Sequence, residues 1–200
     1  LDGALGGGLE GAHQGAVART AGVGAVHRVH IGQAALQHTT GGLTGGTFKR
    51  LTASVAADDV DPVYLPGGQG FVFSSNRQTK SRVNQALGQT YDALDEYERQ
   101  RVLNLHTIDA DGGNLQQISF NQSHDLDPSV LTDGRIVFTR WDHAPGHDEF
   151  NVYTMRPDGT GLELLYGAHS HDTGTDGSDI QFLDPRLMAN GHLLVRAQRF

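Results

Sequence analysis

Two copies of the tripeptide Ser-His-Asp carry the side chains best suited to bind a ligand in this 200-residue sequence. They are Ser123-His124-Asp125 and Ser170-His171-Asp172, and His169 adds another imidazole. Imidazole nitrogens and carboxylates bind metal ions and polar ligands, so His124, His169 and His171 are possible metal ligands. Alternatively, Asp and Ser cap nearby backbone N–H groups while His packs beside them. The sequence leaves both interpretations open: a ligand or metal site at His124, Asp125, His169, His171 and Asp172, or capped loops.

The patterns that common catalytic chemistry requires are missing from the sequence. It has no cysteine, which excludes thiolate metal sites and covalently attached haem c. It also lacks a Gly-x-Ser-x-Gly elbow, a P-loop and a His-Glu-x-x-His motif. Ser123 and Ser170 have no evident third partner or oxyanion hole. We therefore expect no catalytic residue and no cofactor, apart from the possible metal ion.

Charge and hydropathy restrict the partners. Lys and Arg number 15 against 23 Asp and Glu, a formal charge of −8, and nucleic-acid binding needs clustered bases instead. No apolar run of about 18 residues is present to span a bilayer. The expected partner is a protein or a small polar ligand, with no nucleic acid and no membrane span.

Repeats are the strongest signal for the elements that hold these side chains. A unit beginning Asp-Pro and running into a turn and an apolar strand occurs three times, at Asp61-Pro62, Asp127-Pro128 and Asp184-Pro185. A second unit, Leu103–Ser119, matches Phe150–Tyr166 at an offset of 47, and Gly45–Thr52 resembles its end. Hairpin turn pairs such as Asp133-Gly134 separate the strands. Each full unit is therefore a four-stranded antiparallel meander.

Four short strands per repeat predict an all-β fold, a fragment of a β-propeller. Two complete blades are expected at about 60–119 and 126–166, with the last strand of a blade at 48–52 and the first half of another at 183–200. Because propellers close with roughly 4–8 blades, we expect a piece of a longer protein. Residues 1–44 are rich in Gly and Ala, so we expect them to be disordered or non-native, and residues 45–200 to be the partial propeller.

Several repeated residues are expected to be structural. Each Asp-Pro pair (Asp61-Pro62, Asp127-Pro128, Asp184-Pro185) suits the start of a strand, because proline lacks an N–H. Arg77 and Arg140 end comparable strands, and they either pair with carboxylates as a latch between blades or contact a ligand. Within the linker 78–101, the spacing of Tyr91, Leu94 and Tyr97 predicts a short amphipathic helix over 91–101.

The segment DPSVLTDGRIVFTR (Asp127–Arg140), with YTMRPDGTG following at Tyr153–Gly161, resembles the TolB-like, WD40-like (PD40) β-propeller repeat. Residues 109–143 and 155–167 look most like the propeller domain of proteins similar to the hydrazine synthase alpha subunit. The haem chemistry of those proteins needs Cys-x-x-Cys-His, which is missing here. The resemblance implies a non-catalytic binding or scaffold module whose loops at the channel mouth meet a protein or small polar ligand, in the periplasm or secreted. The alternative is an accessory propeller domain of a larger enzyme, either a hydrolase or a hydrazine synthase-like oxidoreductase.

Overall fold

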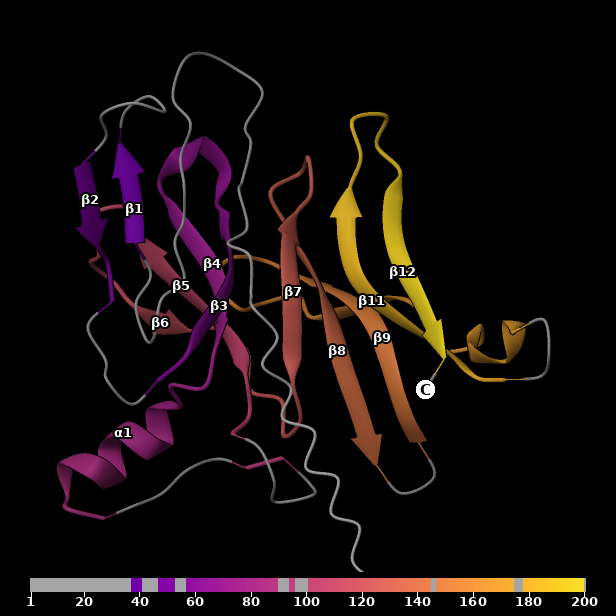
Figure 1. The fold of residues 1–200 in the computed structure, drawn as a ribbon, viewed down its shortest axis with the longest axis horizontal. Helices are drawn as coiled ribbons and strands as arrows, with labels where there is room; N and C mark the ends of the chain where they lie inside the picture. Colours follow the sequence, from indigo (N-terminus) through magenta and orange to yellow (C-terminus); the bar gives the residue numbers. More distant parts are fainter. Residues whose placement is uncertain are drawn as a thin grey trace, which may run out of the picture.

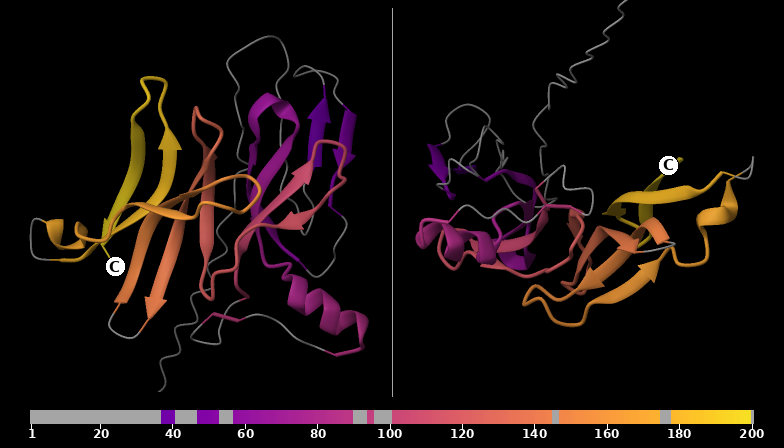
Figure 2. Two further views of the ribbon diagram at one scale, coloured as in Figure 1. Left: turned by 180° about the vertical axis from the view of Figure 1, so that it is seen from behind. Right: turned by 90° about the horizontal axis from the view of Figure 1, so that it is seen from below.

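The computed structural model describes residues 37–40, 47–52, 57–89, 94–95, 101–144, 147–174 and 178–199. In these residues the strands form antiparallel sheets that lie side by side (Figures 1 and 2). Two sheets have four strands each and two have two strands each. The predicted all-β propeller fragment with two complete blades is confirmed.

In each complete blade, strands that follow one another in the chain are neighbours in the sheet: the order is β3-β4-β5-β6 in the first blade and β7-β8-β9-β10 in the second. The first blade consists of β3 (Asp59–Tyr64), β4 (Gly70–Ser75), β5 (Asn104–Asp109) and β6 (Gln116–Gln117). The second consists of β7 (Asp125–Val130), β8 (Ile136–Ala144), β9 (His147–Met155) and β10 (Glu163–Tyr166). The leading half-blade is β1 (Gln37–Thr40) with β2 (Thr47–Arg50), and the trailing half-blade is β11 (Ile180–Leu187) with β12 (Leu193–Arg199).

Apolar side chains on the second strand of each blade form the core. Phe71, Val72 and Phe73 of β4 are fully buried, as are the residues 136–138 of β8. Val72 joins Ile136 and Phe138 in one cluster that bridges the first and second blades. The next cluster joins Val137 to Phe182 of the trailing half-blade. The blades are therefore held together by apolar contacts between neighbouring sheets.

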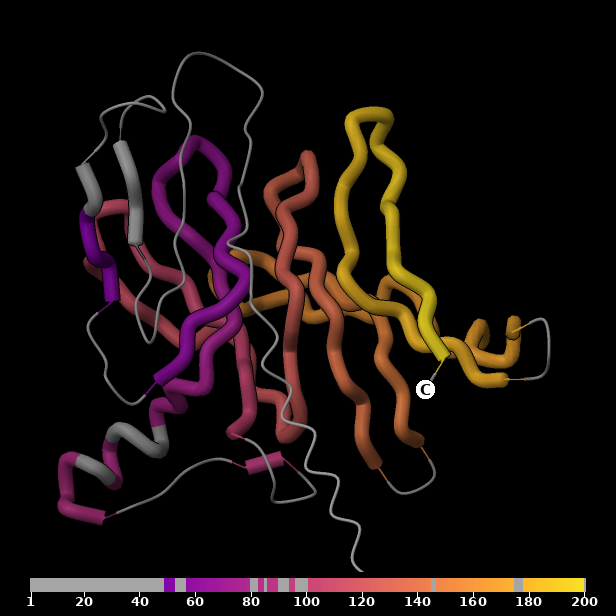
Figure 3. Tube along the Cα trace, in the orientation of Figure 1, coloured from indigo at the N-terminus to yellow at the C-terminus, as the bar shows by residue number. Residues whose placement is uncertain are grey.

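Glycine turns set how closely the blades approach each other. Gly112, Gly134, Gly159 and Gly191 all have positive φ, as the turn pairs predict. A Cβ atom at Gly159, between β9 and β10, would lie 2.7 Å from the carbonyl oxygen of Ile118 in the first blade. The backbone of one blade therefore packs directly on the backbone of the next. The tube trace shows these hairpin turns at the ends of the blades (Figure 3).

The described residues contain an α-helix that the sequence analysis did not predict. It is α1 (Thr79–Ala86), which follows β4, and two short 3₁₀ turns occur at Pro66–Gly68 and His171–Thr173. Most of the predicted helix 91–101 lies outside the described residues, while Leu94 and Arg101 form an isolated antiparallel bridge. β1 lies before residue 45, so the half-blade hairpin crosses the expected domain boundary. The rest of the segment 1–44 lies outside the described residues.

Candidate functional site

We expected the three Asp-Pro pairs to start strands. They lie instead in β-bulges inside the first strand of each blade, which we call the inner strand (β3, β7 and β11). In β7, Leu126 pairs with Thr139 and Ser129 pairs with Val137, so Asp127 and Pro128 oppose a single residue. β3 and β11 show the same register shift at their own Asp-Pro pairs. A bulge releases the proline from the hydrogen-bond ladder and redirects the neighbouring side chain. The repeat motif therefore encodes an interruption of the inner strand.

Each bulge places an aspartate in the left-handed backbone region. The φ angles are 51° at Asp61, 52° at Asp127 and 54° at Asp184. Asp and Asn tolerate this region better than other residues with a side chain, because their short polar groups bond locally. Three equal bulges on three inner strands repeat the same geometry. We call Asp61, Asp127 and Asp184 the inner-strand carboxylates.

The inner-strand carboxylates lie close enough to influence one another. β7 packs beside both β3 and β11. Burial and, after it, the negative charges of Asp61 and Asp184 together raise the pKa of Asp127 to about 6, against the opposing charge of Arg186. Because this folded-state pKa exceeds the ordinary value, ionisation of Asp127 opposes folding as the pH rises through about 6. The three strands thus concentrate negative charge at one place.

Arg186 supplies a positive charge next to this cluster. Repeat comparison could not predict it, because the other repeats have Val63 and Ser129 at the same register position. Its Nη1 donates to the carbonyl oxygens of Asp127, at 3.2 Å, and Pro128, at 3.1 Å. Its Nη2 lies 2.6 Å from Asp184 Oδ1. One guanidinium therefore joins β11 to β7, and it lies beside the carboxylate of Asp184.

Two residues before each bulge in the complete blades, a second aspartate is buried. Asp59 accepts hydrogen bonds from Arg77 and, at 2.7 Å, from Thr52 Oγ1. Asp125 has Arg140 Nε at 3.8 Å. Arg77 and Arg140 thus pair with carboxylates of the adjacent strand in their own blade, β3 with β4 and β7 with β8. Each pair lies within a single blade, so these contacts are not the latch between blades that was one of our two predictions for Arg77 and Arg140.

Asp125 is the more weakly compensated of these two carboxylates. Its side chain is fully buried, and its Oδ2 atom has no hydrogen-bond partner among the described residues. Asn121 donates to Oδ1 at 3.3 Å. Burial raises the pKa of Asp125 to about 6, while Arg140, Ser119 and Asn121 act in the opposite direction. This residue stabilises the blade most effectively when it is protonated.

His124 is built into the core of the blade junction. Its Nδ1 accepts a hydrogen bond from the Leu103 backbone at 3.2 Å, and its ring stacks on Trp141 with centroids 5.8 Å apart. Phe150 also stacks on Trp141, with ring centroids 5.2 Å apart, and Trp141 Nε1 donates a hydrogen bond to Asp148 Oδ1. These contacts are those of a packed structural residue and agree with the capped-loop interpretation for His124.

His171 lies in a different environment, on the 3₁₀ turn before β11. Its ring nitrogens face the Ile180 carbonyl oxygen and, at 2.8 Å, Asn151 Oδ1, and the ring packs on Phe182. His169 and Asp172 are exposed. Among the described residues, no three His, Asp or Glu side chains are grouped so that they could hold a metal ion. The possible metal site at His124, His169 and His171 is therefore not assembled among the described residues: His124 directly precedes β7, whereas eight residues, 172–179, separate His171 from β11.

The sequence analysis did not identify His106, a buried polar residue that connects β5 to the segment after β4 in the first blade. His106 on β5 is buried, and its Nε2 lies 2.8 Å from the Arg77 carbonyl oxygen while Nδ1 lies 2.9 Å from that of Asn104. Burial lowers its pKa. It corresponds to Tyr153 in the second blade, so the repeat comparison gave no indication of this role.

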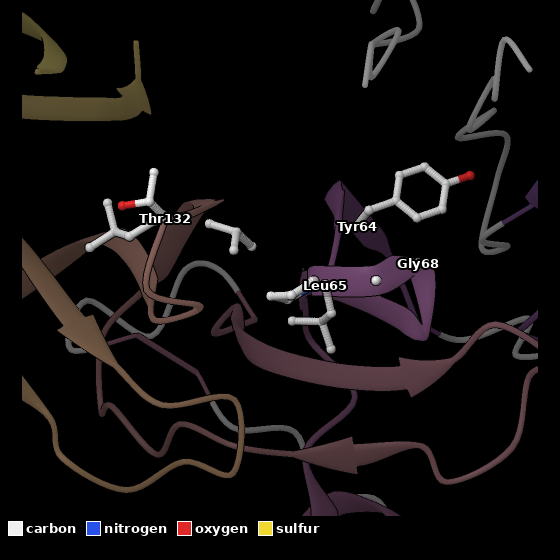
Figure 4. A pocket seen from close by; sticks show the side chains of 8 residues that line it. Tyr64, Leu65, Gly68 and Thr132 are labelled. Atoms are coloured by element: carbon white, nitrogen blue, oxygen red, sulfur yellow. The ribbon is translucent and has the colours of Figure 1, made fainter. Parts of the chain in front are cut away.

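A pocket of 460 Å³ opens at the C-terminal ends of β3 and β7, whereas Asp59 and Asp125 lie at the N-terminal ends of these strands (Figure 4). The β3–β4 and β7–β8 turns form it, and burial raises the pKa of the Tyr64 hydroxyl there to about 12. It is lined by Tyr64, Leu65, Pro66, Gly67, Gly68, Val130, Leu131 and Thr132. The sequence analysis placed the possible ligand site in the connections between blades, whereas this pocket lies between two hairpin turns within the blades.

The fold is that of TolB-like propellers. Hydrazine synthase from Kuenenia stuttgartiensis superposes with a TM-score of 0.60 at 16% identity, over 88% of this chain and 27% of that one. A putative TolB from Agrobacterium tumefaciens gives 0.52 at 17% identity, over 88% of this chain and 55% of that one. No family model and no curated protein matches the sequence. This chain thus spans about a quarter and about half of the two solved structures.

No helix in the described part of the chain is long and apolar enough to cross a membrane.

Proposed function

We propose that this chain is a non-catalytic propeller module that binds a positively charged group of a protein segment or of a small polar ligand. The observation that carries the proposal is the convergence of the inner-strand carboxylates. Asp61 and Asp184 raise the pKa of Asp127 because their charges repel it, and a bound cation would relieve that repulsion. The bulges hold the carboxylates on packed strands, so little ordering is needed when a ligand binds.

The neighbouring pocket extends this recognition surface. It begins at Val130 and Tyr64, three residues beyond Asp127 and Asp61 on the same inner strands. Its lining combines apolar side chains, such as those of Leu65 and Leu131, with the polar residue Thr132. A ligand with a cationic group and a short apolar part would match both features. We assign the carboxylates a role in binding and give no residue a role in catalysis.

Location and context form part of the same proposal. The likeness to a putative TolB supports a periplasmic or secreted module with a protein partner. The likeness to hydrazine synthase supports the second candidate, an accessory propeller domain of a larger enzyme. In either setting the inner-strand carboxylates would remain the binding residues.

Neutralising the inner-strand carboxylates should abolish binding of cationic probes. Asp61→Asn, Asp127→Asn and Asp184→Asn together keep residues that tolerate the left-handed backbone and remove the charge. Calorimetry with an arginine-rich peptide, and separately with spermidine, should show affinity for the parent chain reduced about tenfold or more in the triple variant. The two probes distinguish a protein segment from a small ligand.

Asp133→Asn is the matched control, because Asp133 is an exposed turn residue of the same type. It should bind both probes as the parent chain does. Equal loss of binding in the control and the triple variant would indicate only a general charge effect. That result, or no measurable binding of either probe to the parent chain, would overturn the proposal.

A further inference from the structure

Arg186 shows how the junction between two neighbouring inner strands binds a guanidinium group. It directly follows the Asp-Pro pair of β11, and its side chain reaches back to β7. There Nη1 donates to the carbonyl oxygens of Asp127 and Pro128, at 3.2 Å and 3.1 Å. Nη2 lies 2.6 Å from Asp184 Oδ1 on its own strand. Two backbone carbonyls of one inner strand and a carboxylate of the next therefore form a binding place for a guanidinium.

The preceding junction, between β3 and β7, is built in the same way. β7 packs beside β3 as β11 packs beside β7, and Figure 1 shows these three inner strands following one another across the molecule. A hydroxyl group of the second strand, on Ser74 or Thr139, bonds to the backbone of the next inner strand at both junctions. The carbonyl oxygens of Asp61 and Pro62 and the carboxylate of Asp127 therefore correspond to the acceptors of the junction between β7 and β11.

The two junctions differ in the residue that can fill this place. In β7 the position of Arg186 is taken by Ser129, since each residue directly follows the proline of its bulge. A serine side chain ends at Oγ, so it has neither the charge nor the length of arginine. Within the described residues the Asp127 carboxylate has no salt bridge, whereas the Asp184 carboxylate pairs with Arg186.

We propose that the junction between β3 and β7 binds the guanidinium group of an arginine side chain of a protein partner, in the place that corresponds to Arg186. This inference rests on the proposed function and names the cation. The carbonyl oxygens of Asp61 and Pro62 would accept two N–H groups, and the carboxylate of Asp127 would accept a third. Ser129 is short enough to leave this place to the ligand.

The acceptor set favours arginine over lysine. A guanidinium carries five N–H donors in a planar fork, so one group can reach acceptors on two strands, as Arg186 does. An ammonium group carries three donors on one compact nitrogen and meets fewer of these acceptors at once. The site is therefore expected to distinguish two side chains of equal charge.

Calorimetry of the full chain with oligoarginine and with oligolysine of equal length tests the choice of cation. Both peptides have the same charge, so the general attraction to an acidic chain acts on both. The parent chain should bind oligoarginine about tenfold more tightly than oligolysine. The triple variant that neutralises the inner-strand carboxylates should lose this preference together with the binding.

Ser129→Arg tests the place of binding. The new side chain should fill the junction between β3 and β7 as Arg186 fills the next one, and affinity for oligoarginine should fall about tenfold. Ala189→Arg is the matched control, because it adds the same charge at the exposed β11–β12 turn, and it should bind nearly as the parent chain does. Ser129→Ala adds no charge and should also bind as the parent does. Circular dichroism of each variant establishes that the sheets remain folded.

NMR titration of the parent chain adds a measurement that needs no variant. Burial and the charges of Asp61 and Asp184 raise the pKa of Asp127 to about 6, and a guanidinium bound beside it opposes both effects. Saturating oligoarginine should therefore lower the pKa of Asp127, and oligolysine should lower it less.

Failure of this inference can be distinguished from failure of the proposed function. Equal affinity for the two peptides, with both lost in the triple variant, would overturn the inference and leave the proposed function standing. Equal binding of oligoarginine by Ser129→Arg and Ala189→Arg would overturn the inference as well. A parent chain that binds neither peptide would show that both proposals are wrong.

Discussion

Replacing Gly159 with alanine is expected to lower the free energy of unfolding by about 3 kcal/mol. Gly159 has φ of +84°, which disfavours any residue with a Cβ. The added Cβ would also lie 2.7 Å from the Ile118 carbonyl oxygen, closer than van der Waals contact allows. The neighbouring blade must therefore move, and urea denaturation followed by circular dichroism measures the loss.

Gly191→Ala separates the two causes. Gly191 has nearly the same φ, +82°, but apart from its two chain neighbours no described residue has an atom within 4 Å of its Cβ position. It should therefore show only the backbone penalty, about 1 kcal/mol. A loss at Gly159 no larger than at Gly191 would mean that the blades do not pack backbone against backbone at this turn.

Removing the guanidinium of Arg77 is expected to have an equally large effect. In Arg77→Ala the carboxylate of Asp59, which is fully buried, would keep only Thr52 among the hydrogen-bond donors described above. Leaving a buried charge without its partner typically costs about 3–5 kcal/mol. Thermal or urea unfolding at pH 7 measures this loss of stability.

Two further variants make the Arg77 result specific. Adding Asp59→Asn to Arg77→Ala should restore part of the lost stability, because it removes the uncompensated charge. Arg135→Ala breaks an exposed ion pair with Asp133 and should leave the unfolding midpoint nearly unchanged. A double variant less stable than Arg77→Ala would show that Asp59 is stabilised by contacts other than Arg77.

The strands and their turns were predictable because their signals are local. Apolar runs such as Phe71-Val72-Phe73 and pairs such as Asp133-Gly134 each specify a few neighbouring residues. Repetition then gave the blade boundaries, including the two half-blades. The third apolar run shows the limit of this reasoning: Leu193–Val195 has the same pattern but is not buried, because burial depends on which sheets lie beside β12.

The candidate site was less predictable because it depends on distant parts of the chain. Asp61, Asp127 and Asp184 were recognised as repeated residues, but their proximity follows from the packing of three inner strands. Their bulges also need knowledge of the register, which the Asp-Pro pairs alone do not provide. The two Ser-His-Asp copies have the same sequence but different structural positions, since Asp125 begins the inner strand β7 whereas Asp172 lies in an exposed turn. Their shared sequence therefore did not indicate a shared site.

Titration of the Asp127 carboxyl group by NMR tests most directly whether the inner-strand carboxylates converge. We predict a pKa of about 6 in the parent chain and a lower value in the variant Asp61→Asn/Asp184→Asn, because two repelling charges are removed. Asp133, whose pKa Arg135 lowers, serves as an internal reference that should not change. An Asp127 pKa near its ordinary value, or one that the two substitutions leave unchanged, would contradict the account.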